Sequence, residues 1–228
     1  MPGEARAFYE AAAPSYDERH AGPWAAHLRR RERALLARYA GGTVIDIGCG
    51  TGTHLRPGWA GMDVARGMLL QARGRGMLVQ GDERLPFRDA SADTVLCLFS
   101  VLNLAPALPA ELVRILQPGG RLLLSFATPR DARGQRERVL SSHGRRARLR
   151  LFTLREAEAL FPACRVLARA GLFSAVRPRW GAWDMRWHER LRLAADRLLP
   201  AGRAAMALLV LERLPAQEAR SPPPGPPL

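Results

Sequence analysis

The sequence contains no lysine, so all 35 of its basic residues are arginine. Against 21 acidic residues they give a formal net charge of +14. A strongly cationic chain suits phosphate-rich partners such as nucleic acids. The complete absence of lysine is equally what a GC-rich coding bias produces, because such a bias raises arginine everywhere. The charge therefore leaves a nucleic-acid partner open and does not by itself predict one.

Cysteine is scarce as well and occurs only as Cys49, Cys97 and Cys164. Three cysteines cannot all pair with one another, and their spacing matches no metal-binding pattern. We therefore expect a reduced protein of the cytoplasm without a metal site.

Long apolar segments are also missing. The amino terminus, MPGEARAFYE, carries two glutamates and no apolar core, which argues against a signal peptide. The longest uncharged run, residues 94–110, has 17 residues and contains two prolines. A bilayer-spanning helix needs about 20 apolar residues, so we expect no transmembrane segment.

The composition is otherwise that of a globular protein, with 47% hydrophobic and 25% charged residues in a chain long enough for one domain. Residues 1–40 predict helices interrupted at Pro14 and at Gly22-Pro23. Residues 41–214 predict the main domain, with a helical insertion at about 178–200. Residues 215–228 contain six prolines and predict a disordered tail.

Short apolar runs alternate with helical segments in the main domain, a pattern typical of a parallel sheet covered on both faces. We expect an α/β fold: a doubly wound, Rossmann-like, mainly parallel sheet of seven strands with helices on both faces. Strands are expected at 43–47, 77–80, 94–99, 121–126, 165–170 and 205–211, with another ending at Asp63, and helices at 67–73 and 110–116. Residues 130–150 hold eight arginines without apolar periodicity, which predicts a solvated surface segment.

The strongest local motif is Asp46-Ile-Gly-Cys-Gly-Thr-Gly52, directly after the first expected strand. Its glycines allow a tight turn and close approach of a ligand, as at the nucleotide-binding corner of an open α/β sheet. Thr53 stands where a dinucleotide fingerprint needs glycine, and a phosphate-binding loop needs the lysine that the chain lacks. Asp46 would repel a pyrophosphate and suits an amine or hydroxyl donor instead.

Two further acids follow the next strands. Asp63, at the expected end of the second strand, is placed to accept hydrogen bonds from ribose hydroxyls. Asp82, after the third strand, can accept one from an adenine amine. Together with Asp46, these acids predict a ligand with an adenine, a ribose and a cationic amino-acid tail.

The chain resembles the class I S-adenosylmethionine-dependent methyltransferases, specifically the group with the type 11 domain. Four stretches carry the resemblance in order: VIDIGCGTG (44–52), GMDVARGMLLQAR (61–73), VQGDERLPFRDASADTVLC (79–97) and ELVRILQPGGRLLLS (111–125). The resemblance implies an enzyme that uses S-adenosylmethionine as methyl donor, and a lid at FYEAAAPSYDER (8–19) in which Tyr16 closes over the donor. The donor-site residues that it implies are Tyr16, Asp46, Gly48, Cys49, Gly50, Asp63, Val64, Met68, Asp82, Glu83 and Leu98.

The chain also departs from the family pattern. The 17-residue step from Asp46 to Asp63 is short, which predicts a first helix of a turn or two that ends at Pro57-Gly58. Val101-Leu-Asn103 stands where many relatives carry a histidine pair, so no general base is evident and no catalytic residue is assigned. Ser100 and Asn103 should line the acceptor side. The histidines considered as bases are His20, His27, His143 and His188.

Two acceptors remain open. Trp180, Trp183 and Trp187 stand at helical spacing beside arginines, which predicts a cap helix, or a basic amphipathic element that touches a membrane or covers an apolar acceptor. Quinone and lipid methyltransferases of this family carry helical elaborations there, so a small hydrophobic, lipid- or quinone-like acceptor is preferred.

The alternative acceptor is tRNA. YEAAAPSYDERHAGPW (9–24) and RLFTLREAEAL (150–160) are similar to the tRNA wobble-uridine methyltransferases, and the arginines of 130–150 could contact phosphates. A third interpretation is a non-catalytic, donor-binding scaffold, against which the presence of Asp63 and Asp82 counts.

Overall fold

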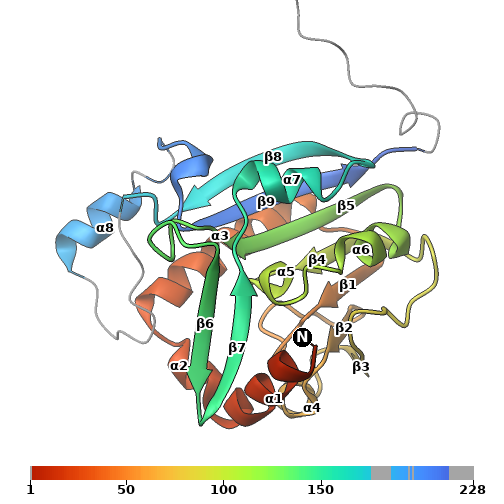
Figure 1. Ribbon diagram of the computed structural model, residues 1–228. Coiled ribbons are helices and arrows are strands. Elements are labelled where there is room, and N and C mark those ends of the chain that lie inside the picture. Colours follow the sequence, from red (N-terminus) through yellow and green to blue (C-terminus); the bar gives the residue numbers. More distant parts are fainter. Residues whose placement is uncertain (1, 176–185, 195, 197, 216–228) are drawn as a thin grey trace, which may run out of the picture.

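A seven-stranded sheet forms the centre of the molecule (Figure 1). The computed structural model describes residues 2–175, 186–194, 196 and 198–215. Strand order is β3-β2-β1-β4-β5-β9-β8, and only β9 runs antiparallel to its neighbours. The strands are β1 (Val44–Ile47), β2 (Ala60–Asp63), β3 (Met77–Gln80), β4 (Ala92–Cys97), β5 (Leu116–Ala127), β8 (Cys164–Leu172) and β9 (Met206–Arg213). The predicted fold class is confirmed.

Helices cover both faces of this sheet because its central strands are apolar on both sides. On β5, Leu122 and Leu124 point into one core, whereas Leu123 points into the core on the opposite face. The helix α3 (Pro23–Tyr39) covers the face of Leu123 through Leu36. The other face is covered by α5 (Val101–Leu104), α6 (Pro109–Ile115) and α7 (Leu154–Ala159) (Figure 1).

The amino-terminal segment is helical and breaks at the predicted prolines. It consists of α1 (Pro2–Ala12), the 3₁₀ turn η1 (Ala13–Ser15), α2 (Tyr16–Arg19) and α3. In α1, the Glu10 carboxylate accepts a hydrogen bond from Gly67 N at 3.1 Å, at the start of α4 (Arg66–Gln71). In α2, the Asp17 carboxylate accepts one from Thr51 Oγ1 at 2.7 Å, in the glycine-rich loop. These bonds fix the segment beside the carboxyl ends of β1 and β2.

Residues 130–150 correct the sequence prediction of a solvated segment without periodicity. They contain an antiparallel hairpin of β6 (Glu137–Ser142) and β7 (Arg145–Arg150), which projects from the sheet towards α1 (Figure 1). Ala147 and Leu149 are buried, and Arg146, Arg148 and Arg150, which alternate with them along β7, are exposed. Buried and exposed residues therefore alternate along β7, as in a half-buried strand. The alternation was not recognised in the sequence because the segment has few apolar residues among many arginines.

The glycine-rich loop supplies a second correction. Residues 48–59 form successive turns and no helix, where a helix of a turn or two was predicted. Gly48, Gly50, Gly52 and Gly58 all have positive φ, which an α-helix does not admit.

The carboxyl-terminal part is described only partly. The helix α8 (Trp187–Ala194) lies within the helical insertion predicted at about 178–200, whose residues 178–185, 195 and 197 lie outside the described residues. The 3₁₀ turn η3 (Ala201–Arg203) follows that range. Most of the predicted tail, residues 216–228, also lies outside them.

Candidate functional site

The eleven predicted donor-site residues gather in two adjoining cavities at the carboxyl ends of the parallel strands. There the chain order reverses between β1 and β4, which is where open α/β sheets bind ligands. The strand-end cavity contains Asp63, Val64, Met68, Asp82 and Glu83, and the loop cavity contains Asp46 and Cys49. Both are lined by Tyr16, Gly48, Gly50 and Leu98, so the two cavities are halves of one site.

Backbone hydrogen bonds shape the glycine-rich loop. Gly48 N and Cys49 N both donate to Met62 O, at 2.7 and 3.0 Å, and so hold the loop against β2. A Cβ on Gly48 would lie 2.3 Å from a methyl carbon of Val101, so only glycine fits there. A Cβ on Gly50 would meet no atom within 4 Å, because the space beside Gly50 is the cavity that it lines.

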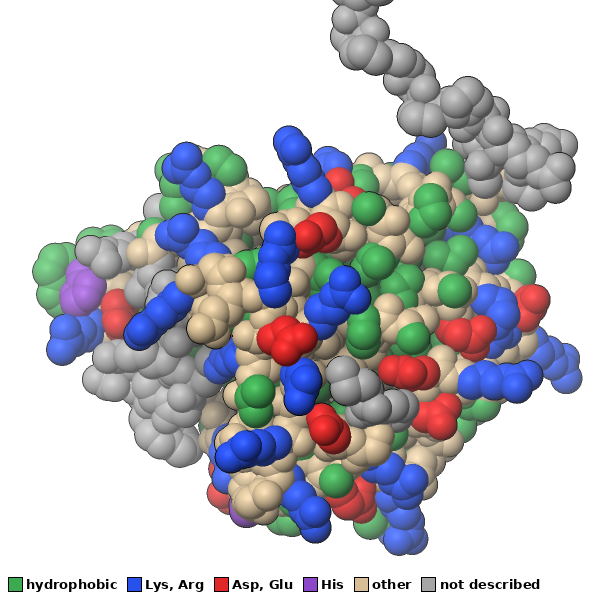
Figure 2. Space-filling view, viewed as in Figure 1, with side chains coloured by type: hydrophobic (Ala, Val, Ile, Leu, Met, Phe, Trp, Pro, Cys, Tyr) green, Lys and Arg blue, Asp and Glu red, His purple; other side chains and the backbone are tan. Residues whose placement is uncertain are grey.

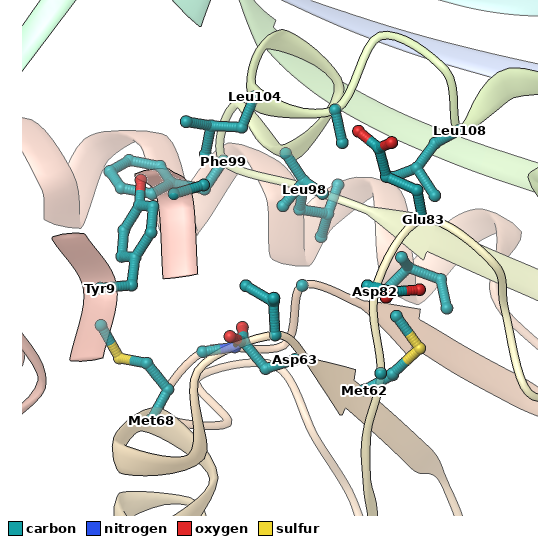
Figure 3. Close-up of a pocket in the computed structure, with 18 of the residues that line it drawn as sticks. Tyr9, Met62, Asp63, Met68, Asp82, Glu83, Leu98, Phe99, Leu104 and Leu108 are labelled. Atoms are coloured by element: carbon teal, nitrogen blue, oxygen red, sulfur yellow. Dashed lines mark hydrogen bonds between the residues drawn. The ribbon is translucent and has the colours of Figure 1, made fainter. Parts of the chain in front are cut away.

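Asp63 lies on the floor of the strand-end cavity, between Tyr9 and Asp82 (Figure 3). One carboxylate oxygen accepts from Gly50 N at 2.9 Å and the other from Ala65 N at 2.8 Å. Burial raises the pKa of Asp63, and these backbone donors oppose the rise. Each oxygen keeps a second lone pair, so the carboxylate can still accept from a ligand hydroxyl.

Asp82 and Glu83 lie at the end of the strand-end cavity opposite Tyr9 (Figure 3). Asp82 accepts a hydrogen bond from Arg84 N at 3.1 Å. Unlike the buried Asp63, Asp82 is exposed. The reason is position, because Asp82 begins an exposed loop after the edge strand β3.

Asp46 is fully enclosed in the loop cavity beside another acid, Glu32 of α3. Burial, together with Glu32 and Asp63, raises the pKa of Asp46 to about 7, whereas His54 lowers it. Glu32 is itself held by His54 Nε2 at 2.9 Å and by the Ser125 hydroxyl. Because Asp46 and Glu32 are two acids close together in a buried cavity, binding of a cationic group beside them is favoured.

The residues Glu32 and His54 were missed from the sequence. Glu32 lies in an arginine-rich helical run whose pattern gives no reason to single it out. His54 could have been noticed, because it is the one histidine in the loop that follows Asp46.

A third space, the hairpin cavity, adjoins the strand-end cavity across the rings of Tyr9, Tyr16 and Phe99, which line both. Its other walls include Phe8, Leu140, Leu149, Met206 and His20. The lining is mainly apolar, with an ion pair between Arg138 and Asp131 among the charged groups. Tyr9 was missed from the sequence, although it stands in the stretch identified as a lid.

Phe99 adopts an unusual backbone conformation at the end of β4. Phe99 and Ser100 have φ of 53° and 70°, a region that residues other than glycine seldom occupy. Ser125 of β5 holds both of them: its hydroxyl accepts from Phe99 N, and its carbonyl accepts from Ser100 N at 2.9 Å. Strain of this kind is concentrated at functional sites, where the surrounding structure maintains it.

Of the two residues predicted to line the acceptor side, one lines a cavity and the other does not. Ser100 lines the hairpin cavity. Asn103 does not: it is buried, and its amide nitrogen donates to the carbonyls of Ala127 and Arg150, so its role is to join α5 to β5 and β7. Trp187 was expected to line or cover an acceptor pocket, but its side chain on α8 is 74% exposed. Trp180 and Trp183 lie outside the described residues.

Among the described residues, no group of three or more His, Cys, Asp or Glu side chains could hold a metal ion. The described helices also include none that is long and apolar enough to cross a membrane.

The fold is that of a methyltransferase-like Rossmann domain. A methyltransferase of Haloferax volcanii, solved with the Trm112 activator, superposes with a TM-score of 0.63 at 20% identity over 92% of this chain and 97% of that one. The [4+2]-cyclase SpnF gives the same TM-score at 20% identity, over 92% and 95%. These likenesses show the fold alone, because one fold hosts many reactions.

Sequence comparison matches part of the chain to known proteins. Residues 45–124 match the family model described as a methyltransferase domain, of type 11. The demethylmenaquinone methyltransferase of Tropheryma whipplei is 38% identical over 122 residues, which cover 46% of this chain and 50% of that protein. The human probable tRNA methyltransferase 9B is 30% identical over 127 residues, which cover 51% and 27%.

The chain spans about half the length of the demethylmenaquinone methyltransferases that it matches. Over residues 45–124 it is similar to the methyltransferase domain of type 11, whose family model these residues match.

Proposed function

We propose that this protein transfers a methyl group from S-adenosylmethionine to a small hydrophobic, lipid- or quinone-like acceptor bound in the hairpin cavity. The observation that supports it is the shared wall of Tyr9, Tyr16 and Phe99 between the strand-end cavity and the mainly apolar hairpin cavity. Methyl transfer from a sulfonium mainly requires that donor and acceptor be held in contact in a dry site. Two adjoining cavities with an aromatic boundary meet that requirement.

The donor fits the chemistry of the cavities. Asp63 would accept from the ribose hydroxyls, and Asp82, with the Glu83 backbone, from the adenine amine. Asp46 would accept a hydrogen bond from the ammonium group of the donor in the loop cavity. Without that cation the negative charge of Asp46 is unfavourable, because the carboxylate is buried near other acids. Tyr16 lines both cavities, and we propose that residues 1–40 act as the lid over them.

Donor binding should depend on pH through Asp46. The pKa of this carboxyl is about 7 in the free protein, and a bound ammonium group would lower it, so binding below pH 7 must release a proton. We expect the dissociation constant to rise up to about tenfold per pH unit as the pH falls from 7 to 5.5. Calorimetry in two buffers of different ionisation enthalpy would measure the released proton.

The Asp46→Asn variant should bind more weakly at pH 7.5 and lose most of the pH dependence. The exposed Asp89, which pairs with Arg114 away from both cavities, provides the control: Asp89→Asn should keep the wild-type profile. If the pH dependence of donor binding is the same in Asp46→Asn as in the wild type, the ammonium group does not bind beside Asp46.

The acceptor class follows from the lining of the hairpin cavity and is supported by the likeness to demethylmenaquinone methyltransferases. The test is incubation of the purified protein with labelled S-adenosylmethionine and a short-chain demethylmenaquinol in detergent. Label should enter the quinol with one S-adenosylhomocysteine per methyl group. Donor binding without transfer to any acceptor would favour the scaffold interpretation instead.

A tRNA acceptor is the second candidate, because Arg145, Arg146 and Arg148 are exposed on the hairpin and the matched relatives include a tRNA methyltransferase. Arginine side chains are spread across the face shown in Figure 2 and interspersed with acids, rather than gathered into one patch. RNA binding would weaken steeply with salt, and neutralising the three arginines would flatten that slope. Activity on an apolar acceptor should be insensitive to salt.

We also propose a peripheral membrane contact through α8, where an apolar acceptor would be collected. Trp187 and Leu191 are 74% and 64% exposed, next to the exposed Arg190. Burying two such side chains is worth about 1.5–3 kcal/mol each, so the double change to serine should lower binding to anionic vesicles at least tenfold. Met77→Ser, an equally exposed side chain on β3, should not. Equal sedimentation of both variants would contradict this contact.

The cytoplasm remains the proposed compartment. Its support is that all three cysteines are free thiols and that Cys49 and Cys97 are buried.

A further inference from the structure

His20 stands where the two proposed substrates would meet. It follows α2 directly, and its ring centroid lies 4.3 Å from that of Tyr16 and 5.2 Å from that of Phe99. Both of these rings line the strand-end cavity as well as the hairpin cavity, whereas His20 lines the hairpin cavity. Its imidazole is therefore on the acceptor side of the boundary, one ring away from the donor side.

The protonation of this imidazole follows from its hydrogen bond. Nδ1 lies 2.8 Å from Tyr16 O, and a carbonyl oxygen only accepts, so Nδ1 carries the hydrogen. In the neutral ring Nε2 then has a free lone pair, on the side of the ring away from the α2 backbone. Nε2 makes no hydrogen bond with any described residue.

We propose that His20 is the general base that removes the hydroxyl proton of a phenol or enol on an apolar acceptor; this rests on the proposed function. The lone pair of Nε2 forms a bond to the proton, and the O–H electrons pass to the acceptor, which becomes the nucleophile. The acceptor forms a bond to the methyl carbon, and the breaking C–S pair stays on sulfur. His20 then gives the proton to solvent, so that one proton is released per methyl group. If carbon is methylated instead, the hydrogen of that carbon leaves to solvent as a proton and its C–H electrons restore the ring. The proton held by His20 then returns to the oxygen, so one proton is again released per methyl group.

The surroundings of His20 suit a base rather than a cation. Burial lowers the pKa of His20, and Arg29 and Arg19 act in the same direction, against the Tyr16 carbonyl and Asp17. The ring is therefore neutral at pH 7 and able to accept a proton. The titratable and charged groups that face it or share its cavity are Tyr9 from α1, Tyr16, Asp17 and Arg19 from α2, Arg29 from α3, and Asp131 and Arg138 from the hairpin side.

The other groups on the boundary are poorly suited to this role. Burial raises the pKa values of Tyr9 and Tyr16, and nearby Asp63 raises both further, so their hydroxyls stay protonated. Arg138 and Asp131 are paired with each other.

The test compares His20→Gln with His143→Gln, a histidine on the exposed hairpin turn. With S-adenosylmethionine kept saturating at every pH, so that the Asp46 dependence of donor binding does not contribute, wild-type kcat/KM for a phenolic acceptor should fall towards acid. Its midpoint should lie below the usual histidine value of about 6.5. His20→Gln should lose about 100-fold in kcat and should lose that acid limb, with donor affinity within twofold of wild type. His143→Gln should match wild type in both.

Two measurements separate a base from a merely structural residue. The loss in His20→Gln should shrink as the acceptor hydroxyl becomes more acidic, and added imidazole should restore part of the activity of His20→Ala. A wild-type pH profile in His20→Gln, or an equal loss on acceptors of every acidity, would overturn the proposal while leaving the proposed function standing. Failure of the wild type to methylate any phenolic or enolic acceptor would contradict both.

Discussion

Replacing Gly50 with leucine is expected to abolish binding of S-adenosylmethionine in a protein that still folds. Gly50 lines both the strand-end cavity and the loop cavity, and a side chain there would extend into the cavity without meeting the protein. Its φ of 55° would cost any other residue about 1–2 kcal/mol. We expect donor affinity to fall by more than about 100-fold, an effect of about 3 kcal/mol, measured by calorimetry.

The chain offers a matched control at Gly58. This glycine also has positive φ, at 84°, and a Cβ there would likewise meet no atom within 4 Å, but it is exposed and lines neither cavity. Gly58→Leu should therefore lose comparable stability and keep donor affinity. If both leucine variants bind the donor like the wild type, the site does not lie beside Gly50.

Changing Asp63 to asparagine should have an effect almost as large, for two separable reasons. Its carboxylate accepts from Gly50 N and Ala65 N, so an amide nitrogen in that position would oppose a backbone N–H. The donor would also lose a charged acceptor for its ribose hydroxyls. We expect a loss of about 1–3 kcal/mol of unfolding free energy and a similar loss of donor binding, that is about 10- to 100-fold.

Asp82→Asn serves as the comparison, because Asp82 is exposed and accepts only from Arg84 N in the loop. It should lower donor affinity by less than about 1 kcal/mol and leave stability unchanged. Thermal unfolding and calorimetry on the two variants measure both quantities. Equal effects of the two substitutions on donor affinity would contradict the distinction that burial makes between these acids.

The gathering of the proposed donor-site residues could be predicted from the sequence because the main ones stand at or directly after strands. Asp46, Gly48 and Asp63 come at strand ends, and parallel strands bring their carboxyl ends to one edge of the sheet. Local pattern and topology were enough to bring residues 13 positions apart into contact, as the hydrogen bond between Gly50 and Asp63 shows.

The acceptor side could not be predicted in the same way, because it is built from long-range contacts. Leu140 and Leu149 come from a hairpin whose alternation was obscured by arginine. Tyr9 reaches the site through the packing of α1 on α4 and β7, and Glu32 reaches Ser125 across 93 positions. Asn103 shows the converse. It is close in sequence to residues that line the cavities, but the hydrogen bonds of its side-chain amide with the backbone of Ala127 direct the side chain into the core.

The central claim is methyl transfer to an apolar acceptor, and the most direct measurement uses no assumption about which one. Purified protein and labelled S-adenosylmethionine are added to a total cell extract, which is then separated into RNA, lipid, protein and small-molecule fractions, with Gly50→Leu as the inactive control. The account predicts label in the organic phase at both low and high salt. Label in the RNA fraction, or transfer that disappears as salt rises, would contradict it.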